Sequence, residues 1–193
     1  MSEEEFVAWA GKHSNAEWVN GEVQLKMPIS GDHDEIQFWF RAVIQNFVER
    51  RKLGKVRGPQ FTIRLPQKPS RRDPDVMFVA DAQLSKLGTT FLDGPADLII
   101  EVISPESTQR DYHEKYFEYE AAGVREYWIV DPLSQTVSVY TLSPAGRYQR
   151  IEAKNGRLSS VVLPDFWINE ADPFKNPLPD VQQLLAEMGT NAQ

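Results

Sequence analysis

The sequence predicts an α/β fold, in the mixed α+β sense, in which helices accompany a β-sheet that continues into an antiparallel extension. The strongest indication is a strand, a crossover helix and a second strand, predicted over Asp97–Ile103, Gln109–Ala122 and Glu126–Asp131. Apolar residues fall on both faces of the first strand, as in strands covered on both sides. Two further strand patterns, Thr136–Leu142 and Arg147–Glu152, follow after turn sequences and predict the antiparallel extension.

The remaining segments predict elements on either side of this unit. An apolar stripe at helical spacing predicts a long helix that begins near Asp32 or Asp34 and runs to about Leu53. Periodicity and turn residues predict the other elements: a short helix over Ser2–Ala10, a hairpin over Glu17–Met27, strands over Lys55–Leu65 and Val76–Ala80, a polar connection with a short helix over Asp81–Gly94, an apolar segment over Leu158–Ile168 and a final helix over Pro179–Met188.

The amino-acid composition limits the number of domains and the kinds of metal site that the chain can form. The 193 residues suggest a single domain over 1–193, and 41% hydrophobic residues indicate a globular protein. Because the chain has no cysteine and only three histidines, a metal would have to be a hard cation held by carboxylates. No secretory leader and no membrane-length apolar run is visible, so we expect a cytoplasmic protein without a membrane partner.

Charge is unevenly distributed along the chain. The net charge is -7, which by itself argues against nucleic acid as a partner. A stretch without any acid nevertheless carries nine basic residues: Arg50, Arg51, Lys52, Lys55, Arg57, Arg64, Lys68, Arg71 and Arg72. This stretch predicts either a solvated face or a surface that binds a polyanion.

Three residues are candidates for a buried site. Glu101 interrupts an apolar strand, and a buried carboxylate must be protonated, paired or metal-bound. Asp75 begins the strand Val76–Ala80, where it is either a turn acid or a site residue. Lys115 lies in the crossover helix, where the alternative to a site role is a surface ion pair with Asp111.

These three side chains can meet. Glu101 lies roughly 7 Å before the end of its strand at about 3.3 Å per residue. Lys115 lies roughly 9–10 Å into the helix at about 1.5 Å per residue, so the helix returning over the sheet brings the lysine level with the glutamate. Two carboxylates and a lysine suit phosphodiester hydrolysis, with Mg²⁺ or Mn²⁺ held by Asp75 and Glu101. The lysine would offset transition-state charge, and the basic stretch would hold flanking phosphates.

The motifs resemble those of the Uma2 family of restriction-endonuclease-like proteins over roughly Trp18 to Leu142. The resemblance is carried by Gly21-Glu22, His33, Pro74-Asp75-Val76, Glu101-Val102-Ile103-Ser104-Pro105, Asp111, Lys115, Tyr119, Ala122-Gly123-Val124 and the run from Glu126 to Pro132. It implies the PD-(D/E)XK nuclease fold, a restriction-endonuclease-like mixed sheet flanked by helices, with a core of about 18–142 and a C-terminal extension over 143–193.

The resemblance also implies roles for individual residues. Asp75 becomes the motif aspartate and Glu101 the second acid of a Mg²⁺-dependent endonuclease, with Glu22 and His33 as auxiliary site residues. The motif lysine is expected two residues after the second acid, where this chain has Ile103, so the lysine is displaced to Lys115.

Three functions remain open at this point. The first is a metal-dependent endonuclease acting on nucleic acid, expected to be DNA, with Arg71, Arg72, Arg57 and Lys55 contacting phosphates. A homodimer is plausible because paired sites cut duplexes. The second is a catalytically inactive module of the same fold that binds DNA or a protein. The third is a carboxylate-pair hydrolase acting on another substrate, which would not need Lys115.

Overall fold

A computed structural model describes residues 1–10, 16–65, 69–105, 107–108 and 110–189 of the chain. The elements in chain order are α1 (Glu3–Ala10), β1 (Ala16–Val19), β2 (Glu22–Leu25), α2 (Gly31–Arg51), β3 (Gly54–Arg57), β4 (Thr62–Leu65), β5 (Ser70–Arg72), β6 (Val76–Ala80), the 3-10 helix η1 (Asp81–Lys86), β7 (Phe91–Asp93), β8 (Leu98–Val102), the π-helix η2 (Arg110–Lys115), α3 (Tyr116–Ala122), β9 (Glu126–Asp131), β10 (Thr136–Leu142), β11 (Tyr148–Ile151), β12 (Arg157–Ser159), β13 (Trp167–Asn169), the 3-10 helix η3 (Asp172–Phe174) and α4 (Val181–Glu187).

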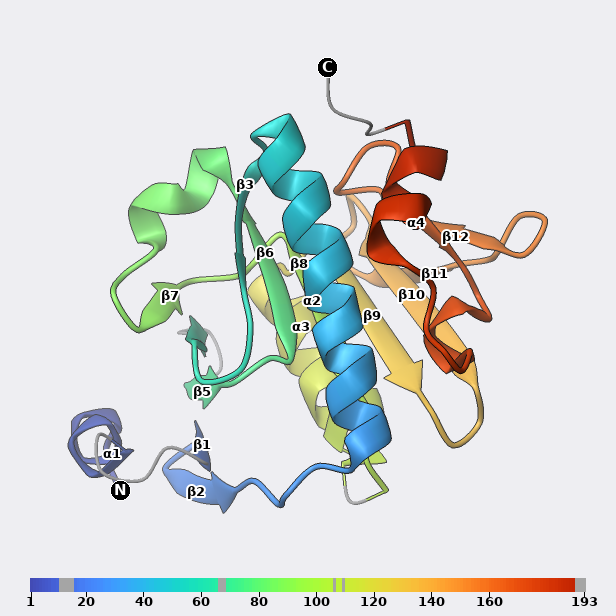
Figure 1. The fold of residues 1–193 in the computed structure, drawn as a ribbon. Helices are drawn as coiled ribbons and strands as arrows, with labels where there is room; N and C mark the ends of the chain where they lie inside the picture. The colour runs from blue at the N-terminus through green and yellow to red at the C-terminus, as the bar shows by residue number, and fades with distance from the viewer. Residues whose placement is uncertain (11–15, 66–68, 106, 109, 190–193) are drawn as a thin grey trace.

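A six-stranded central sheet in the order β11-β10-β9-β8-β6-β3 forms the middle of the molecule. Strands β8 and β9 are parallel and joined by η2 and α3, which confirms the predicted strand–crossover–strand unit. The other neighbouring pairs are antiparallel, and β10 and β11 form the predicted antiparallel extension. Figure 1 shows α2 running across the front of this sheet with α3 behind it.

The two faces of the central sheet bury two separate apolar clusters because side chains alternate along each strand. On one face, the stripe of α2 packs with α4 on residues such as Phe78, Ile100 and Trp128. On the other face, α3 packs on Met77, Ile99 and neighbouring tyrosines. Strand β8 is fully buried, as its two-sided apolar pattern predicts.

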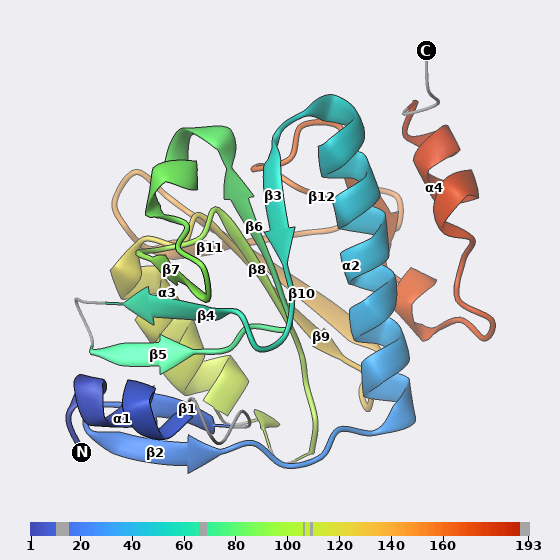
Figure 2. The ribbon, with the colours of Figure 1, turned by 60° about the vertical axis from the view of Figure 1, so that its left-hand side comes forward.

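A second, five-stranded sheet in the order β2-β1-β5-β4-β7 lies beside the central sheet and is covered by α1 (Figure 2). Its hairpin turns at Asn20 and Gly21, which have φ values of 49° and 91°. Two consecutive positive φ angles are typical of the tight turn that an Asn-Gly pair favours. The register places Glu17 opposite Gln24 and Trp18 opposite Arg71, so the hairpin is tied to β5.

Several predicted boundaries need correction. The single strand expected over Lys55–Leu65 is two strands in different sheets, β3 and β4, because Gly58 and Pro59 interrupt it. The polar connection contains the 3-10 helix η1 and also β7, which the sequence reading missed. The crossover helix begins with a π-helical segment, and its predicted first residue, Gln109, lies outside the described residues. No helix in the described chain is long and apolar enough to span a membrane.

Candidate active site

The candidate site is a pocket of about 240 Å³ at the end of the central sheet where β6 begins and β8 ends. The start of α2 closes one side, η2 closes another, and the segment after β2 forms the rim. The charged side chains that line the pocket are Lys26, His33, Asp75, Glu101, Arg110, Asp111 and Lys115. Three of the residues named by sequence reasoning, Asp75, Glu101 and Lys115, therefore meet in one place, and His33 joins them.

Asp75 is fixed from three sides. The antiparallel register pairs Val76 with Ile100, so Asp75, one residue earlier, falls opposite Glu101. Its Oδ1 accepts a hydrogen bond from Gln37 Nε2 at 2.9 Å, and its Oδ2 accepts one from the Val102 backbone N–H at 2.8 Å. His33 Nε2 lies 3.4 Å from the same Oδ2. These partners leave Asp75 in a single orientation toward the pocket.

The electrostatics of the Asp75–His33 pair favour the ionised state of both groups. Burial opposes ionisation of Asp75, but the hydrogen bond and charge of His33 hold the pKa of Asp75 below its usual value. Burial likewise opposes protonation of His33, but the same pairing raises the pKa of the imidazole. His33 reaches this position because its backbone N–H donates to the N-cap Ser30 Oγ, which fixes the first turn of α2.

Glu101 and Lys115 form the centre of the site. Lys115 Nζ lies 2.9 Å from Glu101 Oε1, which also accepts a 2.9 Å hydrogen bond from the Tyr119 hydroxyl. Ile103 points to the same sheet face as Glu101 and packs in the apolar cluster with Tyr119. The position two residues after the acid is therefore filled by core packing, and the helix that covers this face supplies the lysine.

The π-helical segment η2 explains how Lys115 enters the pocket. The segment is wider than an α-helix, and such segments often mark functional positions. Asp111 and Lys115 are both buried, and Lys115 Nζ lies 3.0 Å from Asp111 Oδ1. The pair proposed as an alternative to a site role thus exists, but it lies inside the pocket rather than on the surface.

Carboxylates outnumber cations around Lys115. Burial raises the pKa of Glu101 to about 8 against the pull of Lys115, and the charges of Asp75, Asp111 and Glu17 act in the same direction as burial. Burial disfavours the ammonium of Lys115, but Asp111, Glu101 and Glu17 raise its pKa, so the lysine is charged. Lys115 alone does not balance the three acids within 3.8 Å of its Nζ, and Lys26, His33 and Arg110 are the other basic side chains that line the pocket.

The hairpin acid that lies beside Lys115 is Glu17. It is buried, its Oε1 accepts from the Asp73 backbone N–H at 3.1 Å and lies 3.8 Å from Lys115 Nζ, and its Oε2 accepts from Arg72 Nη1 at 2.9 Å. Glu22 instead lies exposed on β2, and neither of the two acids lines the pocket. Sequence reasoning chose the conspicuous acid after the turn and missed the one five residues earlier.

Arg72 requires a correction. Its side chain is 0% exposed, and its guanidinium donates to both oxygens of Glu118 at 2.9 and 2.8 Å as well as to Glu17 and Gln24. Such an arginine cannot contact a phosphate from this position. Its fork geometry matches the Glu118 carboxylate, and its role is to join β5, the hairpin and α3 beneath the pocket.

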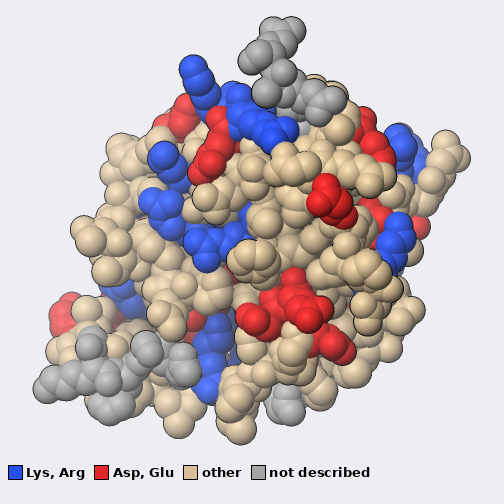
Figure 3. Space-filling model, in the orientation of Figure 1, with Lys and Arg blue, Asp and Glu red and all other residues tan. Residues whose placement is uncertain are grey.

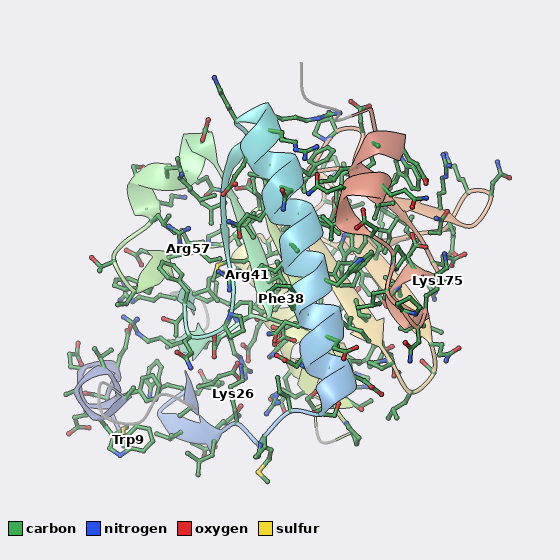
Figure 4. All side chains as sticks on the ribbon, viewed as in Figure 1. Trp9, Lys26, Phe38, Arg41, Arg57 and Lys175 are labelled. Atoms are coloured by element: carbon green, nitrogen blue, oxygen red, sulfur yellow. The ribbon has the colours of Figure 1, made fainter. Side chains whose placement is uncertain are left out.

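The other predicted phosphate contacts lie closer to the surface. Lys55 is exposed, and Arg57 is half-buried with its guanidinium over the Phe61 ring. Figure 4 shows Arg57 beside Arg41 of α2, which is exposed and which sequence reasoning missed. Figure 3 shows basic side chains on this face and a compact acidic group over the lower part of α2. Arg71 is paired with Glu3 of α1 at 2.8 Å, and Lys68 lies outside the described residues.

The donor set suits a hard divalent cation. Asp75 and Glu101 present carboxylates to one pocket, and such ions prefer oxygen ligands. Within the described part of the chain, no group of three or more His, Asp or Glu side chains is placed to hold a metal ion. Mg²⁺ commonly binds through one or two carboxylates and completes its shell with waters and substrate phosphate, which is compatible with this pair.

Comparisons with known proteins agree with the fold. Residues 3–171 match the model of the Uma2 family, described as "Putative restriction endonuclease". A crystal structure described as a "putative nuclease belonging to DUF820" from Anabaena variabilis ATCC 29413 superposes with a TM-score of 0.76 and 18% identity, covering 90% of this chain and 97% of the other. A search of curated proteins found no match.

Proposed function

Because the chain belongs to the Uma2 family, we propose that it is a metal-dependent endonuclease that hydrolyses phosphodiester bonds of DNA in the cytoplasm. The observation that carries the proposal is the 2.9 Å approach of Lys115 Nζ to Glu101 Oε1, opposite Asp75. A lysine beside two acids is the arrangement that phosphodiester hydrolysis uses, and here it is assembled from a strand and the following helix.

Asp75 and Glu101 would hold Mg²⁺ or Mn²⁺. When bound, the ion supplies Lewis-acid polarisation of the phosphoryl oxygen and lowers the pKa of a bound water. Asp75 contributes a carboxylate already oriented by Gln37 and the Val102 backbone, so little ordering is needed when the ion binds. The Tyr119 hydroxyl orients Glu101 in the same way.

Lys115 is proposed to stabilise the negative charge that develops on the phosphoryl oxygens. Asp111, at 3.0 Å, holds the ammonium in place and keeps it protonated. His33 is proposed to position Asp75 through its 3.4 Å contact. Outside the pocket, Lys55, Arg57 and Arg41 would hold flanking phosphates of the DNA. We further propose a homodimer, in which two pockets cut both strands of a duplex.

A second candidate function is favoured by the internal pairing of the site. Both oxygens of Asp75 already accept hydrogen bonds from the protein, and the charge of Lys115 is shared among acids. A pocket satisfied in this way also suits an inactive module that binds DNA without cutting it. That function predicts salt-dependent DNA binding without turnover.

The test is cleavage of supercoiled plasmid and short duplex DNA with Mg²⁺, with Mn²⁺ and with EDTA. Purified wild-type protein is expected to cleave only with a divalent ion, and Asp75→Asn and Glu101→Gln are expected to lower the rate by about 10²-fold or more. Glu152→Gln, an exposed acid of the extension, is the matched control. Activity that survives both pocket substitutions at wild-type level would refute the assignment, and binding without cleavage would favour the module.

A further inference from the structure

The cations that line the pocket differ in how far their charge is already compensated. Lys115 Nζ has acidic oxygens at 2.9, 3.0 and 3.8 Å, from Glu101, Asp111 and Glu17. Lys26 Nζ pairs with Asp73 Oδ2 at 3.0 Å and also donates to the Asp73 carbonyl oxygen. Neither lysine offers an uncommitted charge to an anionic substrate, so phosphate attraction requires another cation.

Arg110 is such a cation. It lines the same pocket, and its buried Nε has no hydrogen-bond acceptor in the structure as described. Among the described acids, none forms an ion pair with it, whereas Arg72 of β5 is paired with three glutamates, Glu17, Glu114 and Glu118. A buried guanidinium nitrogen without an acceptor is costly unless a ligand satisfies it. The paired Arg72 therefore has a structural role, whereas the unpaired Arg110 is available to bind a ligand.

The π-helix places Arg110 next to the reacting groups. Residues five apart lie on one side of a π-helical turn, because its hydrogen bonds join residues i and i+5. Arg110 and Lys115 are the first and last residues of η2, and both line the pocket with Asp111. In an α-helix the same spacing would turn one of the two side chains away from the other. The widened turn therefore presents two cations to one ligand.

We propose that Arg110 binds the phosphate group of the substrate, through the fork of its guanidinium, beside the acids and lysine of the pocket. Arginine matches phosphate oxygens with two parallel N–H donors. This assignment rests on the proposed function for its choice of substrate, since the phosphate is that of a nucleic-acid strand. The two cations would then have different roles. Arg110 binds the phosphate in the ground state, while Lys115 stays paired with its acids until negative charge develops on the phosphoryl oxygens in the transition state.

The test is equilibrium binding of a short fluorescein-labelled DNA duplex, followed by anisotropy over a series of salt concentrations. The buffer contains Ca²⁺, a hard cation that carboxylates accept. Arg110→Gln is expected to weaken binding by about ten- to hundredfold and to reduce the magnitude of the salt slope by about 0.9. Arg110→Lys is expected to weaken binding but to retain the slope, because it keeps the charge and loses the fork.

The control is Arg125→Gln, which removes an arginine whose side chain is 57% exposed and paired with Asp97 away from the pocket. It is expected to leave affinity and slope near wild type. Unchanged affinity and slope in Arg110→Gln, or no binding by the wild type, would overturn the inference. Circular dichroism and thermal melts of both Arg110 variants exclude loss of folding as the cause.

Cleavage measured in parallel with Mg²⁺ separates the two proposals. If the wild type cleaves, Arg110→Gln is expected to raise KM more than it lowers kcat, and an unchanged KM would contradict the role of Arg110 alone. If the wild type binds without cleaving and Arg110→Gln loses binding, the endonuclease proposal fails and the phosphate site stands.

Discussion

Replacing Arg72 by methionine tests whether this arginine belongs to the fold rather than to the DNA surface. The substitution keeps an apolar chain of similar length but removes the group that pairs with Glu17 and Glu118, whose side chains are 1% and 8% exposed. Two carboxylates then remain buried beneath the pocket, with Glu118 deprived of both its guanidinium bonds. Breaking a buried pair in this way costs about 3–5 kcal/mol.

That cost is a large part of the roughly 5–15 kcal/mol that stabilises a typical domain. We therefore expect the midpoint of urea unfolding of Arg72→Met to fall by about 1–2 M. Arg150→Met is the control, because Arg150 is 54% exposed and pairs with the 79% exposed Glu152, so its loss should cost at most about 1 kcal/mol.

A double-mutant cycle sharpens this prediction. Adding Glu118→Gln to Arg72→Met removes one of the stranded charges, so the double variant should be more stable than the sum of the two single effects predicts. The reasoning is refuted if Arg72→Met unfolds within about 1 kcal/mol of wild type, or if it loses DNA binding at unchanged stability.

Three further predictions concern the fold around the site. Burial opposes ionisation of Glu17, but Lys115 and Arg72 lower its pKa from 4.5 to about 2, so its stabilisation is present above pH 4.5 and lost as pH falls through about 2. Urea titrations should show about 3 kcal/mol of this loss in wild type, and its persistence in Glu17→Gln would contradict the assignment. Gly54→Ala should destabilise by about 3 kcal/mol or more, because φ is 154° and a Cβ would lie 2.1 Å from the Val79 carbonyl oxygen. The free energy of unfolding of Gly31→Ala, where a Cβ would meet open space, should stay within about 1 kcal/mol of wild type in urea titrations of both variants. Phe166→Ala should cost about 3–5 kcal/mol in one cooperative transition, since its buried ring packs edge-on against Phe47 in the central core; two separate transitions would show that the C-terminal extension folds independently.

The sequence pattern was sufficient to predict the site where two residues lie on elements that follow each other in the chain, because the rise per residue then sets how far apart they are. Glu101 stood out as a single acid in an apolar strand, and the rises of strand and helix placed Lys115 level with it. The structure brings the two to 2.9 Å. Asp75 could be placed because its strand follows a rigid proline and neighbours β8 in the sheet. These inferences needed only element type and direction.

Other features depend on contacts between segments distant in sequence. Glu17 lies on β1, which is buried throughout and therefore shows no alternation that would mark its inward side. Arg72 sits in a basic run, and composition does not reveal which member meets Glu118, 46 residues later. The π-helical turn was also missed, because one turn is too short for a sequence pattern to distinguish its period from that of an α-helix.

The central claim is that Lys115 replaces the motif lysine absent at Ile103, and the most direct test is the single-turnover cleavage rate of Lys115→Met on duplex DNA with saturating Mg²⁺. Lys115→Arg, which keeps the charge, and the melting temperature of each variant serve as controls. We predict a rate lower by about 10²–10³-fold in Lys115→Met, with partial recovery in Lys115→Arg and a folded protein in both. Wild-type cleavage by folded Lys115→Met would contradict the claim.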